Sequence, residues 1–257
     1  MICVIAGTTE GREMIKELNK YTDDILVSTA TSYGGELLKE YRYKILNDKP
    51  LNSQDMQKMF KENKVNVVID TSHPYAVEVS ENLMNVCRLT SIKYIRLERK
   101  GVAYKFINED KVIIVESYEE LYSYLKNITG NILNTTGSRN LNKILGLELP
   151  NRIIHRVLPS LKVLQECLEL GVSVENIIAI KGPISYDLNR AFIKEYDAKA
   201  ILLKDSGPEG GTEEKIRAAV DEDIYTFIIG RKTLKYDNIF YDVKDVAKEL
   251  KELKGIA

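Results

Sequence analysis

The sequence predicts an α/β protein made of two Rossmann-like domains, each a parallel sheet with helices on both faces. Two observations lead to this prediction. Short runs of β-branched and other apolar residues alternate with longer amphipathic stretches along the chain. The short runs are apolar on both faces, as in parallel strands buried between layers of helices. About ten such strands would be unusual in one open sheet, so two smaller sheets are expected.

The individual elements follow from the same periodicities. Expected strands in the first half are 2–6, 24–29, 43–46, 66–70, 93–98 and 111–116. Expected strands in the second half are 131–136, 152–157, 176–181, 200–204 and 224–229. Expected helices between them include 11–21, 52–63, 76–89, 117–128, 160–171 and 212–223.

The domain boundary is expected in the irregular region that follows the fifth strand. The break is expected near residues 98–130, where the stretch KYIRLERKGVAYKFINEDKVIIVE (93–116) shows a pattern of strand, irregular strand, turn and strand that is suited to passing the chain from one sheet to the other. We therefore expect an N-terminal domain over 1–110 and a C-terminal domain over 111–257. The sequence has no Gly/Ser-rich or Pro-rich linker, which favours closely packed domains with an active-site cleft between them.

Composition excludes several classes of function. The 257 residues carry 37 bases and 38 acids, so bulk charge favours neither nucleic acid nor a membrane surface as partner. No apolar stretch approaches the ~20 residues that span a bilayer, and no signal-peptide pattern opens the chain, so a cytoplasmic protein is expected. Cys3, Cys87 and Cys167 are widely spaced and read as free core residues. His73 and His155 lack partners at ligand spacing, so no metal site is expected.

Ligands of parallel α/β sheets bind at the carboxyl ends of the strands, where helix N-termini converge. The first such turn is AGTTEGR at 6–12, whose candidate anion ligands are Gly7, Thr8, Thr9, Gly11 and Arg12. It matches neither the G-x-G-x-x-G fingerprint nor the P-loop. The alternative is an ordinary strand-to-helix turn with Thr9 as the N-cap.

Two turns of the second half have the same character. NTTGSRNL at 134–141 and KDSGPEGG at 204–211 are rich in small, hydroxylated and basic residues. Their candidate anion ligands are Thr135, Thr136, Gly137, Ser138, Arg139, Lys204, Ser206 and Gly207. For the second of these turns, the alternative is an exposed loop whose glycines only supply flexibility.

Potential acid and carboxylate-binding groups follow the fourth and fifth strands. DTSHPYA at 70–76 places His73 at the rim of the sheet, where it could donate a proton near neutral pH or only position other groups. Arg96 and Arg99 stand where the fifth strand should end, and a guanidinium binds carboxylate or phosphate in a bidentate fork. The alternative for both arginines is a solvated surface position.

Taken in order, these turns resemble the precorrin-6A reductase family of cobalamin biosynthesis. The resemblance rests on AGTTEGR, DTSHPYA, YIRLER, TTGSRNL, RVLPS, KGPIS and KDSG followed by GG, which run in family order from residue 3 to about 230. It implies two Rossmann-like domains with strand exchange between them. It also implies reduction of one double bond of a corrin-type macrocycle by NADPH or NADH, on a metal-free or a cobalt-bearing substrate.

The resemblance also implies roles for the candidate residues. The turns at 6–12, 134–141 and 204–211 would bind the cofactor, although the sequence leaves open which domain holds the dinucleotide. The substrate is a flat apolar ring with many carboxylates, and its candidate ligands are Ser72, Tyr75, Arg96, Arg99 and Tyr186. Arg12, Arg139 and Lys204 are further candidates for its carboxylates. His73 and Asp205 are the candidate proton donors, and the alternative is a proton from solvent or from the substrate's own carboxyls. Other enzymes of the corrin pathway are candidate partners.

Two other functions remain open at this point. A cofactor-independent tetrapyrrole synthase resembling uroporphyrinogen-III synthase would use the same two domains without a dinucleotide. A non-enzymatic two-domain module could close around a small anion. Titration with a nicotinamide cofactor separates both alternatives from a reductase.

Overall fold

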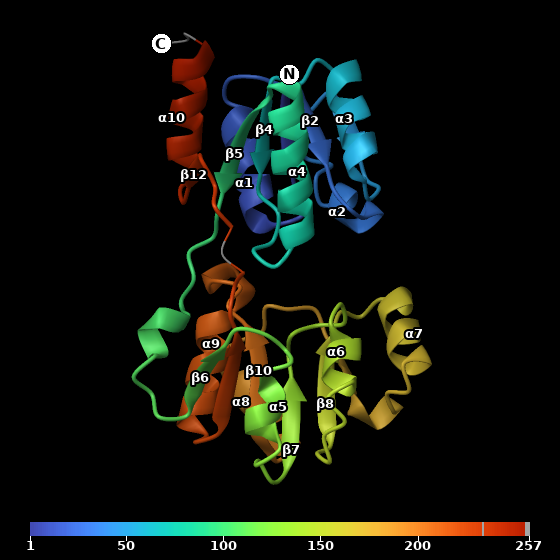
Figure 1. The fold of residues 1–257 in the computed structure, drawn as a ribbon, viewed down its shortest axis with the longest axis vertical. Helices are drawn as coiled ribbons and strands as arrows, with labels where there is room; N and C mark the ends of the chain where they lie inside the picture. Colours follow the sequence, from blue (N-terminus) through green and yellow to red (C-terminus); the bar gives the residue numbers. More distant parts are fainter. Residues whose placement is uncertain (233, 255–257) are drawn as a thin grey trace. The chain divides into compact units, whose positions relative to one another are not determined.

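A computed structural model describes residues 1–232 and 234–254 of the chain (Figure 1). The chain divides into two compact units. The first unit comprises residues 1–99 and 233–257, and the second comprises residues 100–232. Each unit contains one six-stranded sheet in which all pairings between neighbouring strands are parallel.

The sheet of the first unit has the strand order β12-β5-β4-β1-β2-β3. Its strands are β1 (Ile2–Ile5), β2 (Ile25–Ser28), β3 (Ile45–Asn47), β4 (Val67–Asp70), β5 (Lys93–Leu97) and β12 (Ile239–Phe240). The helices of this unit are α1 (Thr9–Leu18), α2 (Ser32–Glu36), α3 (Ser53–Glu62), α4 (Val77–Thr90) and α10 (Val243–Lys254).

Local sequence explains where these helices begin and what they cover. Side-chain oxygens of Thr8, Thr31 and Asn52 accept hydrogen bonds from backbone N–H groups in the first turns of α1, α2 and α3. The helices cover both faces of the sheet, which yields two apolar clusters. One contains residues of α1 and α10, including Val246 and Leu250, and the other contains residues of α3 and α4.

The sheet of the second unit has the strand order β6-β11-β10-β7-β8-β9. Its strands are β6 (Val112–Val115), β7 (Asn131–Asn134), β8 (Ile153–Val157), β9 (Ile177–Ala179), β10 (Ala198–Lys204) and β11 (Tyr225–Ile229). Its helices are α5 (Leu121–Leu125), α6 (Leu141–Leu145), α7 (Leu161–Glu169), α8 (Tyr186–Glu195) and α9 (Thr212–Asp221), with a 3-10 helix at Ala103–Phe106. Ser160 and Ser185 cap α7 and α8.

The predicted fold class is confirmed, and so is the predicted strand exchange. Every strand expected from the sequence is present within two residues of its expected ends. The last strand, β12, joins β5 in the first sheet, whereas β6, which follows β5 in the chain, joins β11 in the second sheet. The edge strands of the two sheets are therefore exchanged.

The two units differ from the expected domains over 1–110 and 111–257. Residues 100–110 belong to the second unit, because Ala103 and Phe106 pack against its core. The end of the chain returns to the first unit, because Val246, Ala247 and Leu250 of α10 are buried in that unit's core. Strand β12 is only two residues long, so no periodicity in the sequence could indicate it.

Candidate active site

The turn between β1 and α1 is a tight glycine turn with open space above a helix N-terminus. Gly7 has φ +115°, and a Cβ built on it would have nothing within 4 Å. The Thr8 hydroxyl accepts from the backbone N–H of Gly11 at 3.2 Å and donates to the carbonyl of Thr71 at 2.8 Å. A Cβ at Gly11 would lie 2.7 Å from Thr71 Oγ1 and 3.0 Å from Ala6 Cα, so only glycine lets α1 pack this closely.

The remaining polar groups of this turn are engaged with the protein. The N-cap is Thr8, one residue before the Thr9 expected for an ordinary turn. Thr9 Oγ1 instead accepts a hydrogen bond from Arg12 Nη2 at 3.1 Å. Glu10 is ion-paired with Arg99 at the end of β5. Burial alone would raise the pKa of Glu10, but the hydrogen bond and charge of Arg99 lower it below its usual value.

Arg96, expected at the substrate rim, is instead fully buried. Its side chain is 1% exposed and its Nη1 lies 3.0 Å from Oδ1 of the equally buried Asp70. Its Nη2 donates to the carbonyl of Ser72 at 2.9 Å and to Glu98 Oε2 at 2.9 Å. Burial would raise the pKa of Asp70, but the charge of Arg96 and three hydrogen bonds hold it below its usual value. Arg96 therefore holds the turn after β4 in place through its hydrogen bonds to Ser72.

His73 lies on the turn that Arg96 holds. The backbone N–H of Tyr75 donates to His73 Nδ1 at 3.3 Å, an arrangement that assigns the ring proton of the neutral tautomer to Nε2. The His73 and Tyr75 rings lie with their centroids 5.7 Å apart. Both side chains are half-buried, so the turn presents them partly to solvent at the carboxyl edge of the sheet.

In the second unit, the hydroxyls expected to bind an anion after β7 have protein partners. Thr135 Oγ1 donates to the Leu202 carbonyl at 2.8 Å, and Thr136 Oγ1 donates to Asn134 Oδ1 at 2.8 Å. The side chain of Asn134 also lies 3.0 Å from Nδ1 of the buried His155. Desolvation lowers the pKa of His155 to about 4, so its ring is neutral at pH 7. What this turn offers a ligand is the open backbone at Gly137, at φ +82°, and the nearby Arg139.

Three basic side chains near the carboxyl ends of β7, β8 and β10 and one on α9 lie close enough for their charges to interact, and we call them the basic cluster. They are Arg139, Arg156, Lys204 and Lys215. Arg156 donates to Asn189 Oδ1 at 2.8 Å, and its pKa is lowered to about 10 by burial. Within the described residues, neither Arg156 nor Lys215 has a carboxylate at ion-pair distance.

The two lysines of the basic cluster have strongly lowered pKa values. Burial, followed by the charge of Arg139, lowers the pKa of Lys204 to about 8. Burial, followed by the charge of Arg156, lowers the pKa of Lys215 to about 7, although the charges of Glu214 and Asp205 act in the opposite direction. Four bases gathered at this edge of the sheet are suited to binding a polyanion.

Sequence reasoning missed Arg156 and Lys215. A signal for Lys215 was available, because Thr212, Lys215, Ile216 and Ala219 all lie on the buried face of α9. A charge within an apolar stripe is unusual unless it meets a partner or a ligand. Arg156 lies inside a strand whose other residues are mostly apolar, and strand periodicity alone gave it no role.

Three other predicted site residues have structural contacts. The Asp205 carboxylate is 11% exposed and accepts hydrogen bonds from the backbone N–H groups of Val102, Ala103 and Gly207. The backbone N–H of Ser206 donates to Thr212 Oγ1 at 3.0 Å. The hydroxyl of Tyr186 donates to Asp221, which ties α8 to the end of α9.

Strand register brings the candidate residues together within each unit. Ile5 pairs with Asp70, and Asp70 pairs with Arg96, so the turns after β1, β4 and β5 are neighbours at one edge of the first sheet. In the second sheet Asn134 pairs with His155 and with Leu202, which aligns the ends of β7, β8 and β10. Each unit therefore carries its own polar site at the carboxyl edge of its sheet.

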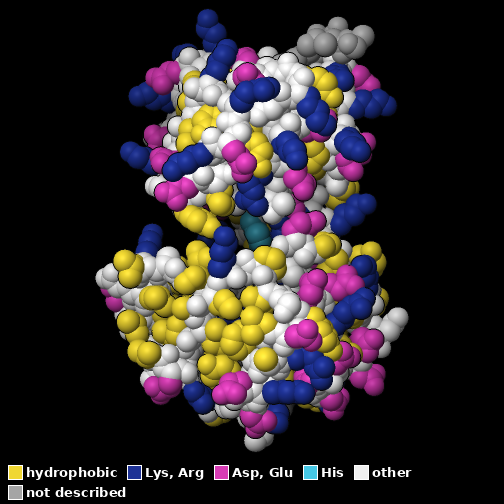
Figure 2. Space-filling model, turned by 180° about the vertical axis from the view of Figure 1, so that it is seen from behind, with side chains coloured by type: hydrophobic (Ala, Val, Ile, Leu, Met, Phe, Trp, Pro, Cys, Tyr) yellow, Lys and Arg dark blue, Asp and Glu magenta, His cyan; other side chains and the backbone are white. Residues whose placement is uncertain are grey.

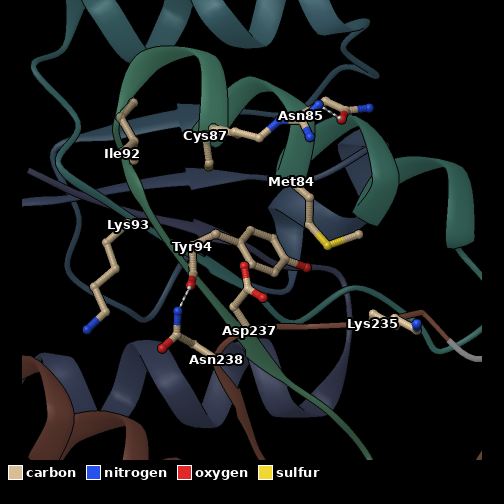
Figure 3. A pocket seen from close by; sticks show the side chains of 10 residues that line it. Met84, Asn85, Cys87, Ile92, Lys93, Tyr94, Lys235, Asp237 and Asn238 are labelled. Atoms are coloured by element: carbon tan, nitrogen blue, oxygen red, sulfur yellow. Dashed lines mark hydrogen bonds between the residues drawn. The ribbon is translucent and has the colours of Figure 1, made fainter.

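A hollow of about 570 Å³ lies in the first unit beside α4 and β5, and its ten lining residues include none of the predicted site residues (Figure 3). Of the three bases that line it, Lys93 pairs with Glu249 and Arg88 Nη2 donates to Asn85. Burial raises the pKa of the Cys87 thiol to about 12, so it is not a nucleophile near neutral pH. This hollow shows no group suited to the expected chemistry.

The surface carries both signs of charge, in agreement with the nearly equal numbers of basic and acidic residues in the sequence. In Figure 2, basic and acidic side chains are interspersed over the upper, first unit, and apolar side chains gather on the visible face of the second. Among residues 1–232 and 234–254, no helix combines the length and apolar character that crossing a bilayer requires. The same residues contain no group of three or more His, Cys, Asp or Glu side chains placed to hold a metal ion.

The chain is similar to known proteins over its whole length. A family model described as "Precorrin-6x reductase CbiJ/CobK" matches residues 1–251. A cobalt-precorrin-6A reductase of Methanocaldococcus jannaschii is 30% identical over 98% of this chain and 99% of its own. The enzyme of the same name from Priestia megaterium is 31% identical over 97% of this chain and 98% of its own.

A solved structure has the same fold. The structure of CobK precorrin-6A reductase superimposes with a TM-score of 0.78, covering 98% of this chain and 96% of that chain. Sequence identity in this comparison is 16%, so the likeness speaks for the shared architecture. That architecture supports the assignment of the exchanged two-sheet fold.

Proposed function

Because the chain belongs to the precorrin-6x reductase CbiJ/CobK family, we propose that it reduces one double bond of cobalt-precorrin-6A, or of metal-free precorrin-6A, with a hydride from NADPH or NADH. The product is the corresponding 6B compound. The observation that carries this proposal is the family match over residues 1–251, together with at least 30% identity to relatives named for that reaction. No observation favours the cofactor-independent synthase or the binding module.

The turn between β1 and α1 is the proposed site of the dinucleotide pyrophosphate. The N-terminus of α1 supplies backbone N–H groups and a positive helix end, and Gly7 leaves open space for a close approach. Gly11 lets the helix pack closely against the strand, which is the role of the last glycine in the dinucleotide fingerprint. The residues present thus fit a pyrophosphate, although the fingerprint itself is missing. The bound nicotinamide supplies the hydride.

The basic cluster of the second unit is the proposed site for carboxylates of the macrocycle. Arg156 and Lys215 are buried cations without a carboxylate at ion-pair distance among the described residues, so an anionic ligand would compensate them. Arg139 and Lys204, expected from the sequence to bind either the cofactor or carboxylates of the substrate, join them at the same edge. We therefore assign these two residues to the substrate.

Reduction of a carbon–carbon or carbon–nitrogen double bond by a hydride also needs one proton. His73 is the proposed donor, because its half-buried imidazole lies at the carboxyl edge of the first sheet and an imidazolium gives up a proton near neutral pH. Asp205 is a poorer candidate, since backbone N–H groups occupy its oxygens. Ser72 and Arg96 act by holding the His73 turn rather than by touching the ring.

An anaerobic assay tests the proposed function directly. The protein is mixed with precorrin-6A or its cobalt complex and with NADH or NADPH, and loss of nicotinamide absorbance is followed. Turnover with at least one pair is expected. If no pair reacts and a fluorescence titration detects no nicotinamide binding, the synthase alternative gains support. Tight binding of the macrocycle without any oxidation of the nicotinamide would support the binding module.

His73→Ala is expected to lower kcat by roughly a hundredfold or more, the usual contribution of a positioned acid. The dissociation constant for NADPH should stay at the wild-type value, because the proposed pyrophosphate site consists of backbone groups of the β1–α1 turn and His73 donates only during the reaction. Stopped-flow single turnovers and fluorescence titration measure the two quantities. An unchanged kcat would show that solvent or a substrate carboxyl supplies the proton.

A further inference from the structure

We propose that Asp205 is a positioning residue that anchors both chain connections between the two units to the carboxyl end of β10. One connection enters the second unit at Lys100, and the other leaves it after Lys232. The inference goes beyond the proposed reaction and rests only on contacts within the second unit. It also replaces the role of proton donor that the sequence favoured for this residue.

The first connection is bound by the Asp205 carboxylate. The backbone N–H of Val102 donates to both Asp205 oxygens, at 3.1 and 3.0 Å, and that of Ala103 donates to Oδ2 at 3.1 Å. These are charge-assisted bonds inside the protein, because the carboxylate is only 11% exposed. The connection is therefore fixed two residues after it enters the second unit.

The backbone of Gly101 also packs tightly against the Asp205 carboxylate. A Cβ built on Gly101 would lie 2.4 Å from Asp205 Oδ2 and 3.3 Å from its Cγ. Gly101 does not have a positive φ, so its backbone conformation does not require glycine. The reason for glycine is the short distance between its Cα and the Asp205 carboxylate. A side chain at this position would push the connection and the carboxylate apart.

The second connection also contacts Asp205, through Arg231. Arg231 Nε donates to the Asp205 carbonyl at 2.7 Å, and its Nη2 lies 3.7 Å from Oδ1. Arg231 precedes the last residue of this unit by one position. Asp205 is thus the point at which the incoming and outgoing chains are both held.

The anchor also adjoins the basic cluster. Asp205 Oδ1 accepts from the backbone N–H of Gly207 at 3.2 Å, which shapes the turn that follows Lys204. Asp205 also contributes to the electrostatic surroundings of Lys215. A ligand that moves the turn after β10 would therefore act on both connections at once, which gives Asp205 a role in positioning without contact with the reacting atoms.

Hydrogen exchange tests the anchor without any assay of function. In Asp205→Asn, exchange of the Val102 and Ala103 amides should be roughly ten- to hundredfold faster, the range for losing a hydrogen bond to a charged group. The control is Asp197→Asn in the same unit, whose side chain is 76% exposed and pairs with Lys199. Unchanged exchange at both amides in Asp205→Asn would overturn the proposal.

A double-mutant cycle tests the packing against Gly101. Gly101→Ala should destabilise the wild type, measured by urea unfolding, and should cost little in Asp205→Ala, where the clashing carboxylate is missing. Equal costs in both backgrounds would contradict the proposal. Because this cycle and the exchange experiment need no substrate, their outcome is independent of whether the protein is a reductase.

Kinetics separate positioning from catalysis. Asp205→Asn should lower kcat by roughly tenfold or more through misplacement, leave KM for the nicotinamide unchanged, and keep the shape of the pH profile of kcat. Loss of one limb of that profile would instead make Asp205 a catalytic acid and would refute the positioning role.

Discussion

Arg96→Met should cost the protein about 3–5 kcal/mol of unfolding free energy, because it leaves the buried carboxylate of Asp70 without its cationic partner. The side chains of Asp70 and Arg96 are 0% and 1% exposed, so water cannot replace the lost ion pair. Urea unfolding at pH 7, followed by circular dichroism, measures the loss. If Arg96 were a substrate ligand on the rim, the variant would keep its stability and lose only substrate affinity.

Two variants control this experiment. Arg42→Met removes an exposed ion pair with Asp23 and should change stability by less than about 1 kcal/mol. Asp70→Asn combined with Arg96→Met should be less destabilised than the sum of the single variants, because neither charge is then left alone. The pKa of Asp70 is lowered in the fold, so its contribution is present above its unfolded pKa of about 3.9 and is lost as pH falls through the lower folded value.

Lys215→Met should weaken binding of the macrocycle by roughly tenfold or more and at the same time stabilise the free protein at pH 7. Both effects have one cause, a buried lysine that has no carboxylate at ion-pair distance within the described residues. The burial penalty is fully present below the folded pKa of about 7 and disappears as pH rises toward the unfolded value of about 10.4. Wild-type stability should therefore rise over this window, and the variant should lose part of that rise.

The same linkage predicts the pH dependence of binding. If the bound carboxylates keep Lys215 protonated, substrate affinity should fall by up to about tenfold per pH unit above pH 7 in the wild type and less steeply in Lys215→Met. Calorimetry at several pH values measures the affinity and the proton uptake. The exposed Lys199→Met is the matched control. If Lys215→Met binds the substrate with the same affinity and the same pH dependence as the wild type, Lys215 does not belong to the substrate site.

Local patterns were sufficient for most of the architecture. Buried strands such as 66–70 and 200–204 are apolar on both faces, and the helices between them repeat their apolar residues at helical spacing, so both could be predicted one segment at a time. The short β12 and the return of α10 to the first unit could not, because their place depends on which core has room for Val246 and Leu250.

The candidate site divides in the same way. The glycine turn at 6–12 could be predicted because its requirements are mainly local. Gly7 adopts a positive φ, and Gly11 lets α1 pack closely against the end of β1. The roles of Arg96 and Asp205 could not, since the same side chain serves a ligand or an ion pair according to its distant neighbours. Arg96 on β5 pairs with Asp70 on the neighbouring strand β4. Asp205 accepts hydrogen bonds from residues more than a hundred positions earlier in the chain.

By itself the sequence determined that the chain alternates buried strands with amphipathic helices, and that its polar turns follow the strands in an order resembling one reductase family. Only the tertiary structure decided which charged groups form ion pairs inside the protein and which are buried without a carboxylate at ion-pair distance. The physical reason is that the cost of a buried charge depends on the groups surrounding it in space, and strand order and the exchange of edge strands bring those groups together.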